Sequence, residues 1–185
     1  MTNAVAVIII LVGSGFLVAF SWRSLSRPRS HGFFRFFAFE GIVFLMVLNA
    51  SHWFVHPGAP MQLLSWLLLM ASLFLAVHGF YLLHAIGKPE APDPGSATFH
   101  FESTTTLVTA GAYRFIRHPM YASVLFGAWG AVLKRPVPLT VTLGVIVTAL
   151  LVATAKAEEA ENLARFGDQY REYMARTRLF IPFVI

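Results

Sequence analysis

Five apolar runs, separated by short segments rich in charge, proline and glycine, set the pattern of this chain. A membrane-spanning helix needs about 20 predominantly apolar residues, and four of the runs come close to or exceed that length. The pattern therefore predicts an all-α, polytopic membrane protein with about five transmembrane helices. The predicted spans are Ala4–Phe20, Phe33–Phe54, Met61–Ile86, Met120–Leu133 and Val137–Ala155. The fourth is short for a full crossing, so a tilted helix or a crossing through thinner bilayer is an open alternative.

Two polar segments complete the pattern. Residues 87–106 carry charges, prolines and a Ser/Thr cluster without a helical period, which is typical of an ordered loop or a lid. Residues 158–176 place apolar and aromatic side chains at helical spacing. We expect this second stretch to form one amphipathic helix that lies on the membrane surface or folds back on the bundle. Glu161 and Arg165 would pair on its wet side.

Composition agrees with a membrane protein of one domain. Of the 185 residues 57% are hydrophobic and 12% charged, with a mean hydropathy of +0.66, whereas soluble domains are roughly 45 to 50% apolar. The expected parts are three N-terminal spans (1–86), a cytoplasmic connector (87–118), a helical hairpin (119–156), and a C-terminal helix and tail (157–185). Basic residues flank the apolar runs and form no patch with interleaved aromatics, so we expect no nucleic-acid partner.

Lysine and arginine are unevenly shared between the two sides of this five-span arrangement. Twelve fall on one side and two, Lys134 and Arg135, on the other. The positive-inside rule places the larger group in the cytoplasm. The first run has no positive segment before it and a basic cluster after it, which argues against a cleaved signal peptide. We therefore expect the N-terminus outside and the C-terminus in the cytoplasm, as in a multi-pass protein of a bacterial inner membrane.

The most concentrated polar chemistry on the cytoplasmic side lies at residues 111–121, GAYRFIRHPMY. Arg117 offers a fork of donors for a carboxylate, and His118 offers a donor or acceptor that switches near neutral pH. Tyr113 and Tyr121 add rings with polar tips. Together these side chains suit an anionic, partly aromatic ligand. The alternative is a positive-inside anchor with interfacial tyrosines.

Acidic residues in or beside the apolar runs form the second set of candidates. Glu158 and Glu159 stand at the cytoplasmic end of the last run. Adjacent side chains on a helix point about 100° apart, so we expect only one of the two to face the bundle. Glu40 lies inside the second run, where an ionisable group is a functional candidate by default. The alternatives are a solvated helical face for the pair and a structural pairing with Arg35 for Glu40.

Several common site types are absent from the sequence. The chain has no cysteine, which excludes disulfides, thiolate zinc sites and a cysteine nucleophile. His52 and His56 are four residues apart but lack carboxylate support, so we predict no metal site. There is no P-loop, and no G-x-G-x-x-G motif follows a strand. A nucleotide-derived ligand would therefore be held by loops and helix ends.

Two segments, TTTLVTAGAYRFIRHPMY and EEAENLARFGDQYREYMARTRLFIP, carry a resemblance when they are taken together. They resemble the isoprenylcysteine carboxyl methyltransferase family and its relatives among the phospholipid methyltransferases. The resemblance covers roughly Thr105–Pro182. The pairing of the two segments at this separation is specific, whereas either half alone is weak, and the N-terminal spans match only in hydropathy.

The resemblance implies S-adenosylmethionine as cofactor, bound on the cytoplasmic side, and methyl transfer to a lipid-soluble or amphiphilic acceptor. It implies catalytic roles for Arg117, His118 and Glu158, in a displacement for which we name no general base. Beside the acceptor, membrane lipids are expected partners, and no protein partner is inferred. Cofactor contacts would fall on Thr105, Thr106, Leu107, Val108, Gly111, Tyr113, His118, Pro119, Met120, Tyr121, Glu158 and Glu159.

Thr154 departs from the family pattern. Eukaryotic relatives carry an arginine four residues before the first glutamate, associated with the methyl-accepting carboxylate, and this chain has Thr154 there. We expect Thr154 and Glu40 on the acceptor side, and the reactive atom of the acceptor stays open. Two other functions are alternatives: an NADPH-dependent membrane reductase of the sterol-reductase type, and a membrane scaffold without catalytic activity. The small size of the chain and its paired glutamates argue against the reductase.

Overall fold

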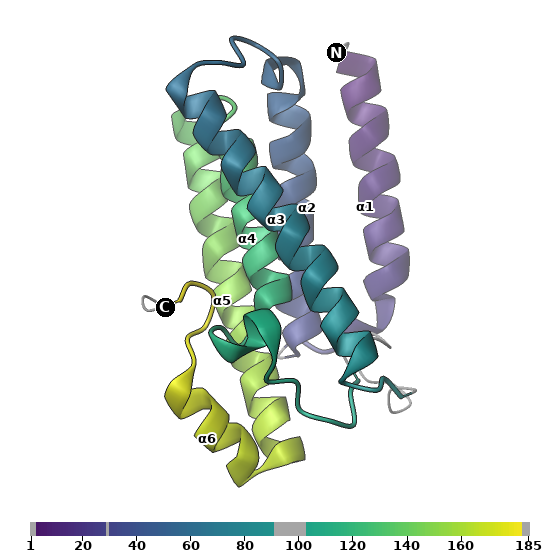
Figure 1. Cartoon of the computed structure of the whole chain (residues 1–185). Coiled ribbons are helices and arrows are strands. Elements are labelled where there is room, and N and C mark those ends of the chain that lie inside the picture. The colour runs from purple at the N-terminus through teal and green to yellow at the C-terminus, as the bar shows by residue number, and fades with distance from the viewer. Residues whose placement is uncertain (1–2, 29, 91–102, 183–185) are drawn as a thin grey trace.

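The computed structural model describes residues 3–28, 30–90 and 103–182 of the chain. These residues form helices (Figure 1), and their β-structure is limited to two isolated bridges, Pro89 with Thr104 and Ile116 with Arg178. The α-helices are α1 Asn3–Leu25, α2 His31–Asn49, α3 Pro60–Ala85, α4 Pro119–Val132, α5 Pro138–Phe166 and α6 Asp168–Arg176, and the 3₁₀ turns are η1 Ala50–His52 and η2 Gly111–Arg114.

In the described residues, four helices are long and apolar enough to cross a membrane, which confirms the prediction of an all-α polytopic membrane protein. The fourth predicted span, Met120–Leu133, forms α4, and the 14 residues of this helix extend about 21 Å at a rise of 1.5 Å per residue. That length is shorter than the roughly 30 Å hydrocarbon core of a bilayer. The four long segments are Ala4–Leu25, His31–His52, Pro60–Ala85 and Pro138–Phe166.

Proline or serine marks the start of α2, α3, α4 and α5. Pro60, Pro119 and Pro138 occupy the first turns of α3, α4 and α5, where a missing backbone N–H breaks no helical hydrogen bond. Before α2, the hydroxyl of Ser30 accepts a hydrogen bond from the backbone N–H of Phe33 at 3.2 Å. These residues fix where each helix leaves its connecting loop.

Small residues bring the helices into close contact. Gly130 on α4 lies against Leu69 of α3, and the hydroxyl of Ser65 donates to the Gly130 carbonyl at 2.6 Å. Gly41 on α2 lies so close to Val147 of α5 that an added Cβ would stand 2.5 Å from a valine methyl. Such contacts replace the hydrophobic driving force that is missing between helices in lipid. The core therefore lies between α2, α4 and α5, with α3 packed on α4.

The first helix lies to the side of this core and packs against α2 (Figure 1). Ser14 of α1 donates a hydrogen bond to Oε2 of Glu40 at 2.7 Å. Glu40 thus has a structural role inside the membrane domain, joining α1 to α2. Its partner is a serine hydroxyl on the neighbouring helix, whereas the sequence suggested Arg35.

The C-terminal part corrects two predictions. Residues 158–176 do not form one separate helix, because α5 continues without a break to Phe166 and the chain turns at Gly167 with φ +57°. Only α6 folds back on the bundle. Glu161 does not take Arg165 as its partner on the wet side, since its Oε1 lies 2.8 Å from Nδ1 of the buried His31 at the start of α2.

Candidate functional site

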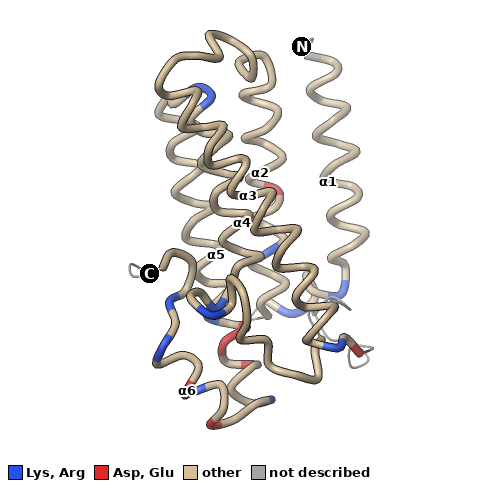
Figure 2. The backbone as a smooth tube through the Cα atoms, in the orientation of Figure 1, with Lys and Arg blue, Asp and Glu red and all other residues tan. Residues whose placement is uncertain are grey.

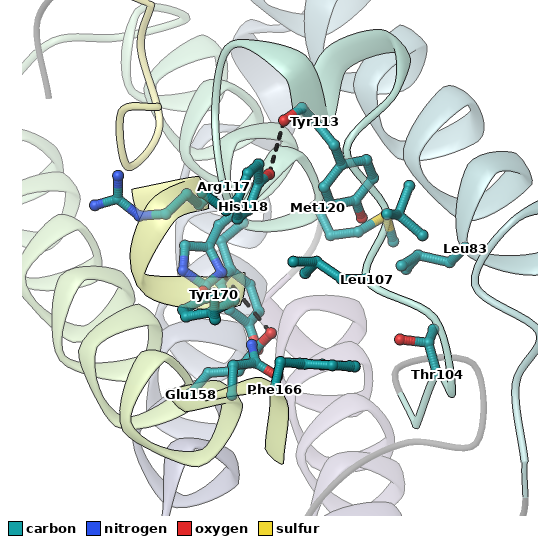
Figure 3. A pocket seen from close by; sticks show the side chains of 14 residues that line it. Leu83, Thr104, Leu107, Tyr113, Arg117, His118, Met120, Glu158, Phe166 and Tyr170 are labelled. Atoms are coloured by element: carbon teal, nitrogen blue, oxygen red, sulfur yellow. Dashed lines mark hydrogen bonds and ion pairs between the residues drawn. The ribbon is translucent and has the colours of Figure 1, made fainter. Parts of the chain in front are cut away.

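A cavity lies where the end of α3, the segment 104–118, the start of α4, the end of α5 and α6 meet (Figure 3). The cavity and its open mouth together enclose about 580 Å³. Its lining combines both halves of the motif, which are some forty residues apart in the chain. The lining residues are Leu83, Thr104, Leu107, Val108, Tyr113, Arg117, His118, Met120, Tyr121, Glu158, Asn162, Phe166, Tyr170 and Tyr173.

The loop that forms one wall is tied to the end of α3. The backbone N–H of Thr105 donates to the Gly87 carbonyl at 3.0 Å, and the Thr105 hydroxyl donates to the Lys88 carbonyl at 3.2 Å. Gly111 has φ +55°, a conformation that residues with a side chain rarely adopt. It also lies against His78 and Leu82 of α3, so an added Cβ would clash with them. The predicted lid in residues 87–106 falls largely on residues 91–102, which lie outside the described residues.

Arg117 is held by protein groups on its polar end. Its Nε donates to Oε1 of Glu159 at 2.6 Å, and its Nη1 donates to the carbonyls of Thr177 at 2.5 Å and Met174 at 3.3 Å. In Figure 3 the guanidinium points away from Met120 and Leu107. Arg117 therefore lines the cavity with its side-chain stem and anchors the C-terminal segment with its charge.

Glu159 forms the buried half of the glutamate pair. Its side chain is 4% exposed and also accepts a hydrogen bond from Lys156 at 2.8 Å, through Oε2. A buried carboxylate is stable only when its charge is paired and its oxygens are hydrogen-bonded. Arg117 and Lys156 meet both conditions. Glu159 thus faces the protein and lies outside the cavity lining.

Glu158 faces the cavity, in keeping with the angle between adjacent helical side chains. Its Oε2 accepts a hydrogen bond from the hydroxyl of Tyr121 at 2.5 Å, and its Oε1 lies 3.8 Å from Nδ1 of His118. The rings of His118 and Tyr121 stack, with centroids 5.5 Å apart. Nε2 of His118 is buried and has no hydrogen-bond partner within the described residues. The site therefore holds one carboxylate oriented by a tyrosine and a histidine.

Two tyrosines of α6 close the cavity. The hydroxyl of Tyr173 donates to the carbonyl of Tyr113 at 2.7 Å, which joins α6 to η2. Burial raises the pKa of both the Tyr170 and Tyr173 hydroxyls above the ordinary tyrosine value. Both side chains are therefore neutral hydrogen-bond donors at neutral pH.

The structure brings together most of the residues that the sequence singled out. Of these, Leu107, Val108, Tyr113, Arg117, His118, Met120, Tyr121 and Glu158 line the cavity. Thr105, Thr106, Gly111, Pro119 and Glu159 lie outside the lining, and Thr105, Gly111 and Glu159 hold its walls in place.

The two acceptor-side candidates lie away from the cavity. Thr154 is fully buried in α5, and its hydroxyl donates to the carbonyl of Leu150 at 2.8 Å. Glu40 contacts Ser14 of α1. In addition, the described residues contain no group of three or more His, Asp or Glu side chains that could hold a metal ion.

The sequence pattern did not single out six lining residues: Leu83, Thr104, Asn162, Phe166, Tyr170 and Tyr173. A signal for two of them was present, because Asn162 and Phe166 follow Glu158 at steps of four residues on α5. Steps of four keep side chains on one face of a helix. Phe166 and Tyr170 belong to the apolar spacing that predicts a surface helix, and in the structure both line the cavity.

Comparisons with known proteins agree with the two-part motif. The family model described as phospholipid methyltransferase matches residues 60–169. The chain is 26% identical over 123 residues to methanethiol S-methyltransferase 1 of Bradyrhizobium diazoefficiens, covering 63% of this chain and 38% of that protein. It is 31% identical over 86 residues to a probable protein-S-isoprenylcysteine O-methyltransferase of Oryza sativa subsp. indica, covering 46% of this chain and 45% of that protein.

A third relative matches over more of the chain. It is protein-S-isoprenylcysteine O-methyltransferase B of Arabidopsis thaliana, with 28% identity over 144 residues, 77% of this chain and 66% of that protein. The chain thus spans less than half the length of the first two relatives and about two thirds of the third. No solved structure matches the chain.

Proposed function

Because the chain belongs to the phospholipid methyltransferase family, we propose that it transfers a methyl group from S-adenosylmethionine to a lipid-soluble or amphiphilic acceptor. We place the reaction at the cytoplasmic face of the membrane. The observation that carries this proposal is the cavity in which Glu158, Tyr121 and His118 meet. It joins the two motif halves at one end of a membrane bundle.

The lining suits S-adenosylmethionine in charge and chemistry. The partly exposed carboxylate of Glu158 can accept hydrogen bonds from an ammonium group or from ribose hydroxyls. Phe166 and Met120 offer apolar surface for an adenine ring and a methionine chain.

When bound, S-adenosylmethionine supplies an electrophilic methyl group on a sulfonium sulfur. The residues of this chain would bind and orient the reactants and exclude water. Alignment of two reactants can lower a barrier by roughly 7 to 11 kcal/mol. Tyr121 and His118 orient the Glu158 carboxylate. Arg117 contributes indirectly, because it holds Glu159 and the C-terminal segment that closes the cavity.

The charge distribution supports a cytoplasmic site. Most lysines and arginines gather at the end of the bundle opposite the N-terminus, where α6 also lies (Figure 2). The cavity is at this same end. Basic residues are retained on the cytoplasmic side of membrane proteins. The N-terminus would therefore lie outside and the C-terminus in the cytoplasm.

The buried Thr154 bears on the acceptor. At the position where eukaryotic relatives carry an arginine, this chain has a neutral side chain that is fully buried and hydrogen-bonded to its own helix. No cation is available at this position to recognise an acceptor carboxylate. We therefore propose an acceptor that is held by its apolar part, with a reactive atom that needs no arginine at this position.

The direct test is to incubate the purified protein with methyl-labelled S-adenosylmethionine and a host membrane extract. Mass spectrometry should then find the label in one class of lipid-soluble or amphiphilic molecule. In calorimetric titrations, Glu158→Gln should weaken cofactor binding about 10- to 100-fold, the range expected for a hydrogen bond to a charged group. Glu172→Gln is the matched control, because Glu172 is an exposed carboxylate on α6 outside the cavity lining.

Three results would each contradict a defined part of the proposal. Equal cofactor affinity for Glu158→Gln and Glu172→Gln would reject the site. Binding of NADPH in place of S-adenosylmethionine would identify a reductase. Cofactor binding without any labelled product in the membrane or soluble fractions would favour a scaffold.

A further inference from the structure

A cationic groove lies on the outer side of η2 and α6, separate from the cavity interior. It consists of two adjoining hollows that share Arg114, Phe115 and Arg176. Thr109 and Tyr173, which also lines the cavity, complete the first hollow, and the second adds Ala175, Arg178 and Pro182. Three exposed arginines thus line one continuous surface, and neither hollow has an acidic residue in its lining.

The three arginines of this cationic groove carry no ion pair with a described carboxylate. Their neighbours behave differently. Arg171 on the same helix pairs with Asp168 at 2.8 Å, and Arg117 pairs with Glu159. The guanidinium of Arg114 lies over the Phe115 ring, 5.9 Å from its centroid, and leaves its donors available. Among the described residues, the groove therefore presents positive charge without an ion-pair partner.

Backbone hydrogen bonds bring the segments of two of these arginines, Arg114 and Arg178, together. The N–H of Arg178 donates to the Phe115 carbonyl at 3.0 Å, and the N–H of Arg117 donates to the Arg178 carbonyl at 2.7 Å. These bonds pair the segment before α4 with the tail after α6. Arg114 and Arg178, which lie far apart in the chain, are thereby brought to the same surface. The forked donors of arginine match the oxygens of a phosphate group.

The groove also lies at the boundary between the polar and apolar parts of the molecule. Immediately after Arg178, Leu179 and Phe180 enter the apolar core formed with α4 and α5. Phe115 is 50% exposed beside the arginines, and Pro182 is also exposed there. In Figure 1 the tail runs from α6 along the side of the helical bundle. A ligand here would meet both guanidinium groups and apolar surface.

We infer that this cationic groove binds the phosphate of an anionic membrane lipid, with Arg114, Arg176 and Arg178 contacting the headgroup and Phe115 lying along the acyl part. A free phosphate would satisfy the same donors, but it would make no use of the apolar side of the groove. The lipid is a bound partner and not the methyl acceptor, because the groove lies outside the cavity lined by Glu158.

Native mass spectrometry of the full-length protein in detergent can test this inference, with phosphatidylglycerol and phosphatidylcholine as probes. The wild type should retain phosphatidylglycerol in preference to phosphatidylcholine. The triple variant Arg114→Gln/Arg176→Gln/Arg178→Gln should bind phosphatidylglycerol at least about tenfold more weakly. Arg23→Gln/Arg27→Gln/Arg171→Gln is the matched control, because it removes three exposed arginines elsewhere and keeps the same net charge.

Two results would overturn the inference. An equal loss of binding in the control triple variant would show general charge attraction in place of a defined site. Displacement of the lipid by millimolar inorganic phosphate would assign the groove to a soluble anion. Circular dichroism should show an unchanged helix content. If the triple variant does not fold, Arg176→Gln alone can replace it. This variant should fold, because the backbone of Arg176 takes no part in the pairing that holds Arg178, and it should still weaken lipid binding.

Discussion

The two ends of the bundle each bury a cation, and they hold it in opposite ways. At the end that carries the α4–α5 loop, Lys134 is 3% exposed, with Nζ 3.5 Å from the centroid of the Trp66 ring and 3.2 Å from Oε1 of Gln62. At the other end, Arg117 is paired with the buried carboxylate of Glu159. One cation thus has neutral partners, whereas the other is part of a charge pair.

This difference separates a structural closure from the candidate functional site. Gln62 also donates to the carbonyl of Lys134 at 3.0 Å, so lysine and glutamine bind each other in both directions and tie α3 to the α4–α5 loop. At the Arg117 end the paired charges lie behind the cavity wall, and a second carboxylate, Glu158, is left for a ligand. The Arg117–Glu159 pair thus holds the cavity wall in place and leaves the Glu158 carboxylate facing the cavity.

Arg117→Met should have the largest effect on stability. It leaves Glu159 buried with Lys156 as its cationic partner and the His118 ring 3.8 Å away, and it removes the bonds to the carbonyls of Met174 and Thr177. Breaking one half of a buried pair costs about 3–5 kcal/mol. Thermal unfolding in detergent, followed by circular dichroism, should show a large decrease in melting temperature. The double variant Arg117→Met/Glu159→Leu should recover part of it.

The control for this prediction is Arg171→Met. Arg171 and Asp168 form an exposed pair at 2.8 Å, with side chains 75% and 88% exposed, and such pairs contribute between 0 and about 1 kcal/mol. A similar loss of stability for Arg117→Met and Arg171→Met would mean that the Arg117–Glu159 pair does not anchor the C-terminal segment.

The fold was largely predictable because apolar runs are long and their boundaries carry proline. The prediction of a single amphipathic helix over residues 158–176 was wrong for a local reason. Nothing in the polarity of residues 158–166 distinguishes the continuation of a membrane helix from a new surface helix. The break lies at Gly167, which takes a positive φ that only the backbone reveals.

The site was predictable in part. The glutamate pair and the segment 111–121 were found because polar residues stand out against apolar runs. Helix geometry predicted that only one of Glu158 and Glu159 faces the bundle. Which of the two lines the cavity depends on the elements packed around α5. Arg117 was expected to contact a cofactor carboxylate, and its commitment to Glu159 and to tail carbonyls depends on contacts across 42 to 60 residues.

Lys134→Met should have a smaller effect than Arg117→Met. The change removes the cation–π contacts with Trp66 and Trp53 and the hydrogen bond to Gln62, but it leaves no buried charge behind. A loss of about 1–2 kcal/mol is expected from these contacts. Unfolding in detergent should place this variant between Arg171→Met and Arg117→Met. A loss as large as that of Arg117→Met would contradict the contrast between neutral and charged partners.

The smallest effect concerns alkaline pH, where the two ends should respond with opposite sign. Burial lowers the pKa of Lys134, so below about 10.4 the unfolded chain holds a proton that the folded chain has lost, and stability rises with pH. Burial raises the pKa of Tyr170, so above about 10 the folded chain keeps a proton that the unfolded chain loses, and stability falls. Melting temperatures should show that Lys134→Met removes part of the rise and Tyr170→Phe part of the fall. The same pH dependence in both variants and the wild type would contradict this assignment.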